Sequence, residues 1–142
     1  MRALLIVRAG IATTVQDGGR FGQLREGIPP SGAMDWSALR TGQHRLGHQN
    51  DEAALEFAYG ELQVQPTDHC SLLVTGAPVT LAIDGAIVDH NAVHTVPPGA
   101  LVAMSASTSG VYSYLHLRGG ICLLYTSPSP RDATLSRMPS SA

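Results

Sequence analysis

Short apolar runs separated by glycine, proline and Asp-Gly or Pro-Gly pairs follow one another along much of the chain. Runs of this length, bounded by turn residues, are typical of β-strands. The pair Asp84-Gly85 between two such runs predicts a tight hairpin. The expected strands are Met1–Val7, Ile11–Val15, Ala54–Tyr59, Glu61–Gln65, Ser71–Thr75, Val79–Ile83, Ala86–Val88, Val93–Val96, Leu101–Met104 and Val111–Leu117. Ile11–Val15 is interpreted as continuing the first run, and Ala54–Gln65 as one stretch. A mainly β fold of the barrel or sandwich type is expected.

One substantial helix interrupts this pattern, over roughly Met34–Leu46. Either Ser31 or Asp35 is placed to cap its start, and Gly47 is well placed to end it. Before the helix, Gly18–Gly32 is expected to form a long loop. The residues expected on the buried helix face are Met34, Ala38, Leu39, Gly42 and Leu46.

Composition limits the classes of function. The 142 residues fit one domain, and only 14% are charged, with a net charge of −2 and 5% aromatic residues, so nothing supports a nucleic-acid role. The apolar runs are too short to span a membrane, and no signal peptide is visible. With Cys122 set aside, Cys70 is the only cysteine, which favours a reducing cytoplasm.

The densest polar chemistry lies in the loop that begins Gln16-Asp17-Gly18-Gly19-Arg20. Asp17 and Arg20 are close enough in sequence to pair, and the Gln16 amide can bond a ligand amide or carboxylate. These groups are candidates for catalysis, with the backbone at Gly18 close to substrate. The alternative is that they only hold the loop together.

A second candidate lies at the start of the helix, in Pro29-Pro30-Ser31-Gly32-Ala33-Met34-Asp35. Ser31, Gly32 and Asp35 would bind substrate there, because backbone N–H groups at a helix N-terminus attract anions. A plain helix cap explains the same residues equally well.

Glu56 is the third candidate, a carboxylate in the apolar run Ala-Leu-Glu-Phe. Buried and unpaired, it would have a raised pKa and could act as a base. An ion pair with Arg20, Arg25 or Arg40 is the alternative. The six histidines follow no zinc-site spacing, so no metal is expected.

Five collinear blocks carry a family resemblance; they read TTVQDGGRFG, GIPPSGAMDWSALR, LGHQNDEAALEFAYGELQV, LLVTGA and YLHLRGGI. Together they resemble the KipA family, also known as the C subunit of 5-oxoprolinase, allophanate hydrolase subunit 2 or the urea amidolyase-type biotin-dependent carboxyltransferases. The resemblance covers about residues 1–121 and implies the N-terminal portion of such a protein. It implies a β-barrel-like half that packs with a second, cyclophilin-like half.

The resemblance also implies a function within a complex. A 5-oxoprolinase subunit would work with KipI-type and LamB/YcsF-type partners to hydrolyse 5-oxo-L-proline to glutamate at the expense of ATP. The urea amidolyase branch instead transfers carboxyl from biotin, on a separate carrier, to urea or a similar amide. A third alternative is a non-catalytic regulator that binds a KipI-type protein. On each reading the chain alone is expected to be inactive.

The family pattern stops after Ile121. Residues Cys122–Ala142 are rich in Ser, Thr and Pro and sustain no periodicity. They resemble the translation of a sequencing adapter, and we expect a non-native, disordered tail. The alternative is a natural tail with Ser-Pro phosphorylation sites at Ser127 and Ser129.

Overall fold

The computed structural model of the chain describes residues 3–121, in which two antiparallel five-stranded sheets and one α-helix form the fold. The first sheet has the strand order β1-β4-β9-β6-β7, and the second has the order β2-β3-β10-β5-β8. The strands are β1 (Leu4–Arg8), β2 (Ala12–Gln16), β3 (Ala54–Ala58), β4 (Leu62–Pro66), β5 (Cys70–Gly76), β6 (Leu81–Ile83), β7 (Ala86–Val88), β8 (His94–Val96), β9 (Val102–Met104) and β10 (Ser113–Leu117). The expectation of a mainly β fold with one main helix is confirmed.

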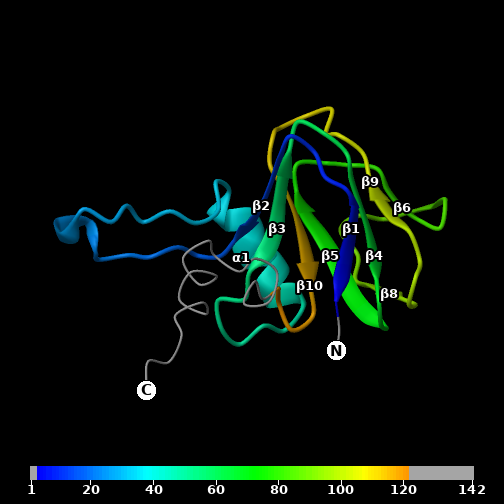
Figure 1. Cartoon of the computed structure of the whole chain (residues 1–142), viewed down its shortest axis with the longest axis horizontal. Helices are drawn as coiled ribbons and strands as arrows, with labels where there is room; N and C mark the ends of the chain where they lie inside the picture. The colour runs from blue at the N-terminus through cyan, green and yellow to red at the C-terminus, as the bar shows by residue number, and fades with distance from the viewer. Residues whose placement is uncertain (1–2, 122–142) are drawn as a thin grey trace, which may run out of the picture.

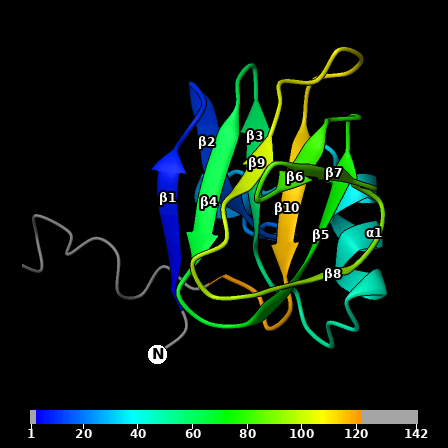
Figure 2. The ribbon, with the colours of Figure 1, turned by 90° about the vertical axis from the view of Figure 1, so that its right-hand side faces the viewer.

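The elements are arranged in three layers (Figures 1 and 2). The two sheets pack face to face, and helix α1 (Trp36–Arg45) covers the outer face of the second sheet through contacts with β5 and β10. Side chains alternate between the two faces of a strand. In β3, Leu55 and Phe57 therefore enter the core between the sheets, while Ala54 packs against Leu39 of the helix.

Two glycines mark two of the points where the chain changes sheet. Gly10 lies between β1 and β2, and Gly60 lies between β3 and β4. A Cβ atom built on Gly60 would lie 2.9 Å from the Cα atom of Gly10, so the two backbones touch. The expected continuity of Ile11–Val15 with the first strand, and of Ala54–Gln65 as one stretch, is therefore wrong: each pair of strands is divided between the two sheets.

The hairpin between β6 and β7 forms as expected. Asp84 and Gly85 have φ angles of 48° and 83°, and two adjacent left-handed residues are characteristic of a type I′ turn. Asp84 is also bonded to the backbone of Leu101, whose N–H donates to the Asp84 carboxylate over 2.8 Å. This contact joins the hairpin to the segment that leads into β9.

Helix α1 is capped by Asp35, whose carboxylate accepts the N–H of Ala38 over 3.0 Å. At the other end Gly47 takes a φ of 72°, as expected for the residue after a helix. Ser31, the other proposed cap, lies further upstream. Met34 was expected on the buried face, but it precedes the helix and is 66% exposed. Its backbone N–H donates to the carboxylate of Glu56.

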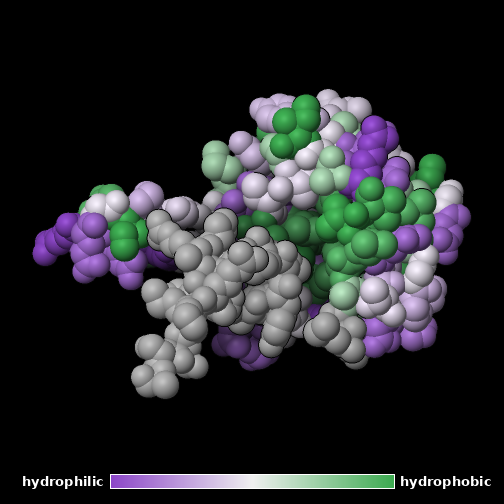
Figure 3. Space-filling model, viewed as in Figure 1, coloured by the Kyte–Doolittle hydropathy of each residue, from purple (hydrophilic) through white to green (hydrophobic). Residues whose placement is uncertain are grey.

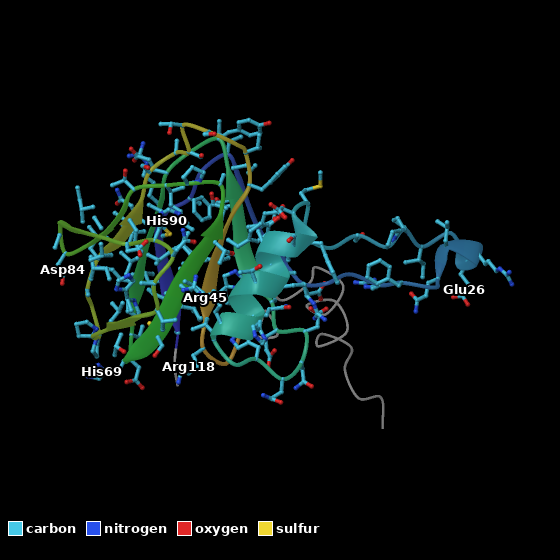
Figure 4. The ribbon with its side chains drawn as sticks, turned by 180° about the vertical axis from the view of Figure 1, so that it is seen from behind. Glu26, Arg45, His69, Asp84, His90 and Arg118 are labelled. Atoms are coloured by element: carbon cyan, nitrogen blue, oxygen red, sulfur yellow. The ribbon has the colours of Figure 1, made fainter. Side chains whose placement is uncertain are left out.

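The segment of residues 17–33 extends from the body as a long arm (Figure 1). A 3-10 helix, η1 (Leu24–Glu26), forms its tip, and Glu26 marks this far end in Figure 4. Phe21 and Leu24 on the arm are each 72% exposed. The long loop expected at Gly18–Gly32 is thus confirmed, with one short helical turn that the sequence pattern did not indicate.

Strand β1 forms an edge of the first sheet and, among the described strands, pairs with β4 alone. Leu5, Ile6 and Val7 are exposed, and apolar surface is visible over β1 in Figure 3. Consecutive exposed apolar residues on an edge strand are typical of an interaction surface. Within residues 3–121, no helix is long and apolar enough to cross a membrane. The expected tail, Cys122–Ala142, lies outside the described residues.

Candidate functional site

The base of the arm is held closed by direct backbone contact. Gly19 and Gly32 have φ angles of 85° and 93°, which favour glycine. A Cβ atom on Gly32 would lie 2.9 Å from backbone atoms of Gly19. Two backbone bonds close the same point: Arg20 N–H donates to Pro30 O over 2.6 Å, and Ala33 N–H donates to Asp17 O over 3.1 Å. The residues on both sides of the arm are therefore fixed relative to one another.

A pocket of about 380 Å³ opens beside this base. It brings together five of the residues that the sequence singled out, from both ends of the arm. Ala53 and Ile121 add apolar surface from elsewhere in the chain. The lining residues are Val15, Gln16, Asp17, Gly19, Arg20, Ser31, Gly32, Ala53 and Ile121.

Arg20 is the unpaired cation of this pocket. Within residues 3–121, its guanidinium group makes no hydrogen bond or ion pair, although its backbone N–H is bonded to Pro30. The expected Asp17–Arg20 pair is not formed, because Asp17 Oδ1 instead accepts the N–H of Gly19 over 2.8 Å. An uncommitted guanidinium group at a pocket wall can bind an anion or stabilise a developing negative charge.

Gln16 and Ser31 complete the polar lining. Gln16 donates an Nε2 hydrogen to Thr14 over 3.1 Å, which orients its amide at the end of β2. Ser31 has a φ of 50°, a left-handed conformation that costs a non-glycine residue about 1 kcal/mol. Such conformations are found at binding and catalytic sites more often than elsewhere.

Asp51 ties this loop to the helix, a role that sequence reasoning missed. Its Oδ2 atom accepts the N–H of Gly18 over 2.7 Å. Its Oδ1 atom accepts from Nε2 of Gln43, over 2.9 Å, and Gln43 also donates to the carbonyl of Glu52. Gly18 itself is buried and does not line the pocket. Asp51 and Gln43 follow no recognisable motif, and their contacts depend on the fold.

Glu56 and Asp35 lie apart from the pocket, at the start of helix α1. Glu56 is 5% exposed, and its Oε2 atom accepts the N–H of Met34 over 2.8 Å and the hydroxyl of Tyr114 over 2.7 Å. The Tyr114 oxygen in turn accepts the N–H of Asp35 over 2.7 Å. Glu56 therefore pairs with none of the expected arginines, so that expectation is wrong. The N–H groups of Met34 and Asp35 are bonded from inside, and the binding of substrate by Ser31, Gly32 and Asp35 stays a prediction.

Electrostatics favours this arrangement. A carboxylate beside a helix N-terminus interacts well with the helix dipole. Burial raises the pKa of the Tyr114 hydroxyl well above its ordinary value, and its bond to Glu56 raises it further. Tyr114 therefore remains protonated and donates. The assignment of Glu56 as a catalytic base stays a prediction, whereas its structural contact with the helix is evident.

His116 forms a second buried polar contact under the helix. Thr75 donates its hydroxyl hydrogen to Ala38 O, so it accepts from Nε2 of His116, 2.9 Å away. Burial, with a smaller contribution from the nearby His48, lowers the pKa of His116 to about 4, so the ring is neutral near pH 7. A Cβ atom on Gly42 would collide with this ring, which explains a glycine within the helix. In the sequence, this contact is indicated only by two polar residues, Thr75 and His116, inside the apolar runs of β5 and β10.

No group of three or more His, Cys, Asp or Glu side chains suited to a metal ion occurs within residues 3–121. His116 is engaged with Thr75 under the helix and does not line the pocket at the base of the arm. The candidate site is therefore the pocket at the base of the arm, with Arg20 as its charged group.

Known proteins are similar in sequence to most of this chain. The chain is 37% identical to the C subunit of 5-oxoprolinase from Escherichia coli (strain K12) over 123 residues, which are 83% of this chain and 38% of that protein. It is 31% identical to urea amidolyase of Saccharomyces cerevisiae over 122 residues, covering 84% of this chain and 6% of the yeast enzyme. The chain thus spans well under half the length of the proteins that it matches.

Comparison of the fold with solved structures also indicates a likeness to urea amidolyase. The crystal structure of the K. lactis urea amidolyase superimposes with a TM-score of 0.79 at 30% identity, over 83% of this chain and 7% of that structure. The sequence model of one family, the carboxyltransferase domain, subdomain A and B, matches residues 26–136. This range continues past Ile121, and the assignment of Cys122–Ala142 as a non-native tail stays a prediction. The chain belongs to this carboxyltransferase-domain family, together with urea amidolyase and the C subunit of 5-oxoprolinase.

Proposed function

We propose that the chain is part of a 5-oxoprolinase-type enzyme and that the pocket at the base of the arm holds the amide of 5-oxo-L-proline. The observation that carries the proposal is the uncommitted guanidinium group of Arg20 beside Gln16 and Ser31. The sequence identity to the 5-oxoprolinase protein, higher than that to urea amidolyase, supports this choice of substrate.

Hydrolysis of the lactam of 5-oxoproline needs a pocket with fixed hydrogen-bond donors. The lactam carbonyl of 5-oxoproline is stabilised by resonance, so its attack builds negative charge on oxygen. Fixed donors aimed at that oxygen stabilise the transition state because they need no rearrangement when the charge appears. In the proposal Arg20 supplies this charge stabilisation, and Gln16 and Ser31 orient the amide. The arm-base contacts keep the three groups at fixed separations.

The loop Gly18-Gly19-Arg20 does not fit the phosphates of ATP. A phosphate cradle needs uncommitted backbone N–H groups. Here the N–H of Gly18 donates to Asp51, that of Gly19 to Asp17, and that of Arg20 to Pro30. We therefore propose that ATP binds in another part of the complex and that the backbone of this loop contacts none of its phosphates. KipI-type and LamB/YcsF-type proteins are the proposed partners.

Carboxyl transfer is the second candidate. The likeness to the K. lactis urea amidolyase in both sequence and fold favours it. The Gln16 amide and the Arg20 guanidinium group suit the ureido and carboxylate groups of a carboxylated biotin, which would supply the carboxyl group when bound. A purely regulatory contact with a KipI-type protein is the remaining alternative, and it requires no substrate in this pocket.

A chimera separates these functions. The matched residues of this chain would replace the corresponding part of the C subunit of E. coli 5-oxoprolinase, and the chimera would be assembled with the other subunits of that enzyme. We expect ATP-dependent formation of glutamate from 5-oxo-L-proline. If the complex assembles but supports only carboxylation of urea, the second candidate is correct. If it assembles and supports neither reaction, both catalytic proposals are wrong.

A further inference from the structure

A second pocket, of about 530 Å³, lies at the other end of helix α1. The helix end and the turn after β10 form its walls, and none of its residues belongs to the pocket at the base of the arm. Its volume is within the range of small-molecule sites in proteins. The lining residues are His44, Arg45, Leu46, Gly47, His48, Gln49, Glu52, Arg118 and Gly119.

His48 gives this pocket an unsatisfied acceptor. Its side chain is only 3% exposed, and Nε2 lies 3.0 Å from the carbonyl oxygen of Leu117. A carbonyl only accepts, so Nε2 donates its proton to Leu117, and Nδ1 is the ring atom left to accept. Nδ1 is buried and makes no hydrogen bond among the described residues. Unsatisfied buried polar atoms are rare in proteins and indicate a missing partner.

Glu52 lies beside this acceptor. Its Oε2 atom is 3.8 Å from Nδ1 of His48 and already accepts the N–H of Asn50 over 3.2 Å. A single nitrogen donor can lie about 2.9 Å from both acceptors, which is the ordinary length of such a bond. An ammonium group suits this position, because its three hydrogens can serve both acceptors and its charge complements Glu52.

Two arginines in the lining of the same pocket favour a negatively charged group on the ligand. Arg45 ends helix α1 and Arg118 follows β10, and both lie next to the helix on the same side of the molecule in Figure 4. Neither guanidinium group makes an ion pair within residues 3–121. Guanidinium groups favour carboxylates, which they bind with paired hydrogen bonds.

Together these groups call for a ligand with an ammonium group and carboxylates on one small molecule. We propose that this pocket binds a free α-amino acid of the acidic type, with the ammonium group between His48 and Glu52 and the carboxylates on Arg45 and Arg118. The proposal does not depend on the reaction assigned to the pocket at the base of the arm.

The test compares two probes that differ only in the ammonium group, L-glutamate and glutarate. Binding to the full chain would be followed by NMR through the amide signals of Gly47 and Gly119. We expect saturable binding of L-glutamate and binding of glutarate that is at least about tenfold weaker, since a lost charged hydrogen bond has this effect. Glu52→Gln should reduce L-glutamate to the affinity of glutarate, and Arg118→Met should weaken both probes.

Matched controls are available on distant surfaces. Glu61→Gln and Arg25→Met make the same chemical changes away from the pocket and should leave both affinities unchanged. Arg20→Gln should also have no effect, so this test is independent of the proposed enzyme function. Equal affinities for the two probes, no saturable binding of L-glutamate, or unchanged L-glutamate binding in a folded Glu52→Gln variant would each overturn the proposal.

Discussion

The hydroxyl of Tyr114 donates to the carboxylate of Glu56 over 2.7 Å, and together these two side chains hold the chain as it enters helix α1. Glu56 accepts the N–H of Met34, and Tyr114 accepts the N–H of Asp35. The two residues face each other on neighbouring strands, β3 and β10. The sheet thus fixes where the helix begins, and with it the second end of the arm that carries the pocket.

Tyr114→Phe should therefore destabilise the protein by about 1.5–3 kcal/mol, because it removes a hydrogen bond to a charged group and leaves the N–H of Asp35 without its partner. Urea unfolding followed by circular dichroism measures this change. Tyr59→Phe is the matched control, because Tyr59 is 70% exposed, and it should change stability by less than about 0.5 kcal/mol. Equal effects of the two variants would contradict the account.

Gly32→Ala tests the closed base of the arm. The new Cβ would lie 2.9 Å from the backbone of Gly19, at a φ of 93° that alanine avoids. Gly22→Ala is the matched control, since Gly22 has a φ of 88° but no atom within 4 Å of the added Cβ. We expect about 1–2 kcal/mol from backbone strain in both, and about 1–3 kcal/mol more in Gly32→Ala from the collision. Thermal unfolding of both variants gives the difference, and the absence of any difference would show that the base is not closed.

His116 should make stability depend on pH. Its pKa is about 4 in the folded protein, against an ordinary value of 6.5 for the unfolded chain, so between these values the unfolded chain binds more protons. Its contribution is therefore complete above about pH 6.5 and is lost as the pH falls toward 4, by up to roughly 3 kcal/mol. His116→Gln keeps a donor for Thr75 and cannot titrate. The difference in Tm between pH 7 and pH 5 should be smaller in this variant than in the wild type.

Deletion of Cys122–Ala142 should leave the Tm of the protein unchanged, because the composition of this segment offers little surface to bury. Differential scanning calorimetry of the full and shortened chains measures this. A cooperative loss of stability would show that these residues belong to the fold.

The sequence predicted elements well where local chemistry determines them. Asp84-Gly85 requires a tight turn, and Gly47 suits the residue after a helix, so both were found. Division of the strands between two sheets was missed, because the Gly10–Gly60 contact joins segments that are distant in sequence. The local conformational preferences of single residues carry no information on a contact between distant segments.

The candidate site divides in the same way. Gln16, Arg20 and Ser31 stood out because polar groups among glycines are unusual, and the structure places them around one pocket. The partners of Glu56 were predicted wrongly, because charge complementarity suggested an arginine, whereas the register of β3 and β10 places Tyr114 beside it. Asp51 was missed altogether, since its function is to connect the loop with the helix.

The central claim is that Arg20 acts on substrate in the pocket at the base of the arm. Its most direct test is kcat/KM for 5-oxo-L-proline in the assembled chimera, with Arg20→Gln compared with Arg25→Gln, the same change further along the arm. We predict a loss of about 100-fold or more in kcat/KM for Arg20→Gln with unchanged Tm and assembly, and a change of less than about twofold for Arg25→Gln. Wild-type kcat/KM in a folded, assembled Arg20→Gln complex would contradict the account.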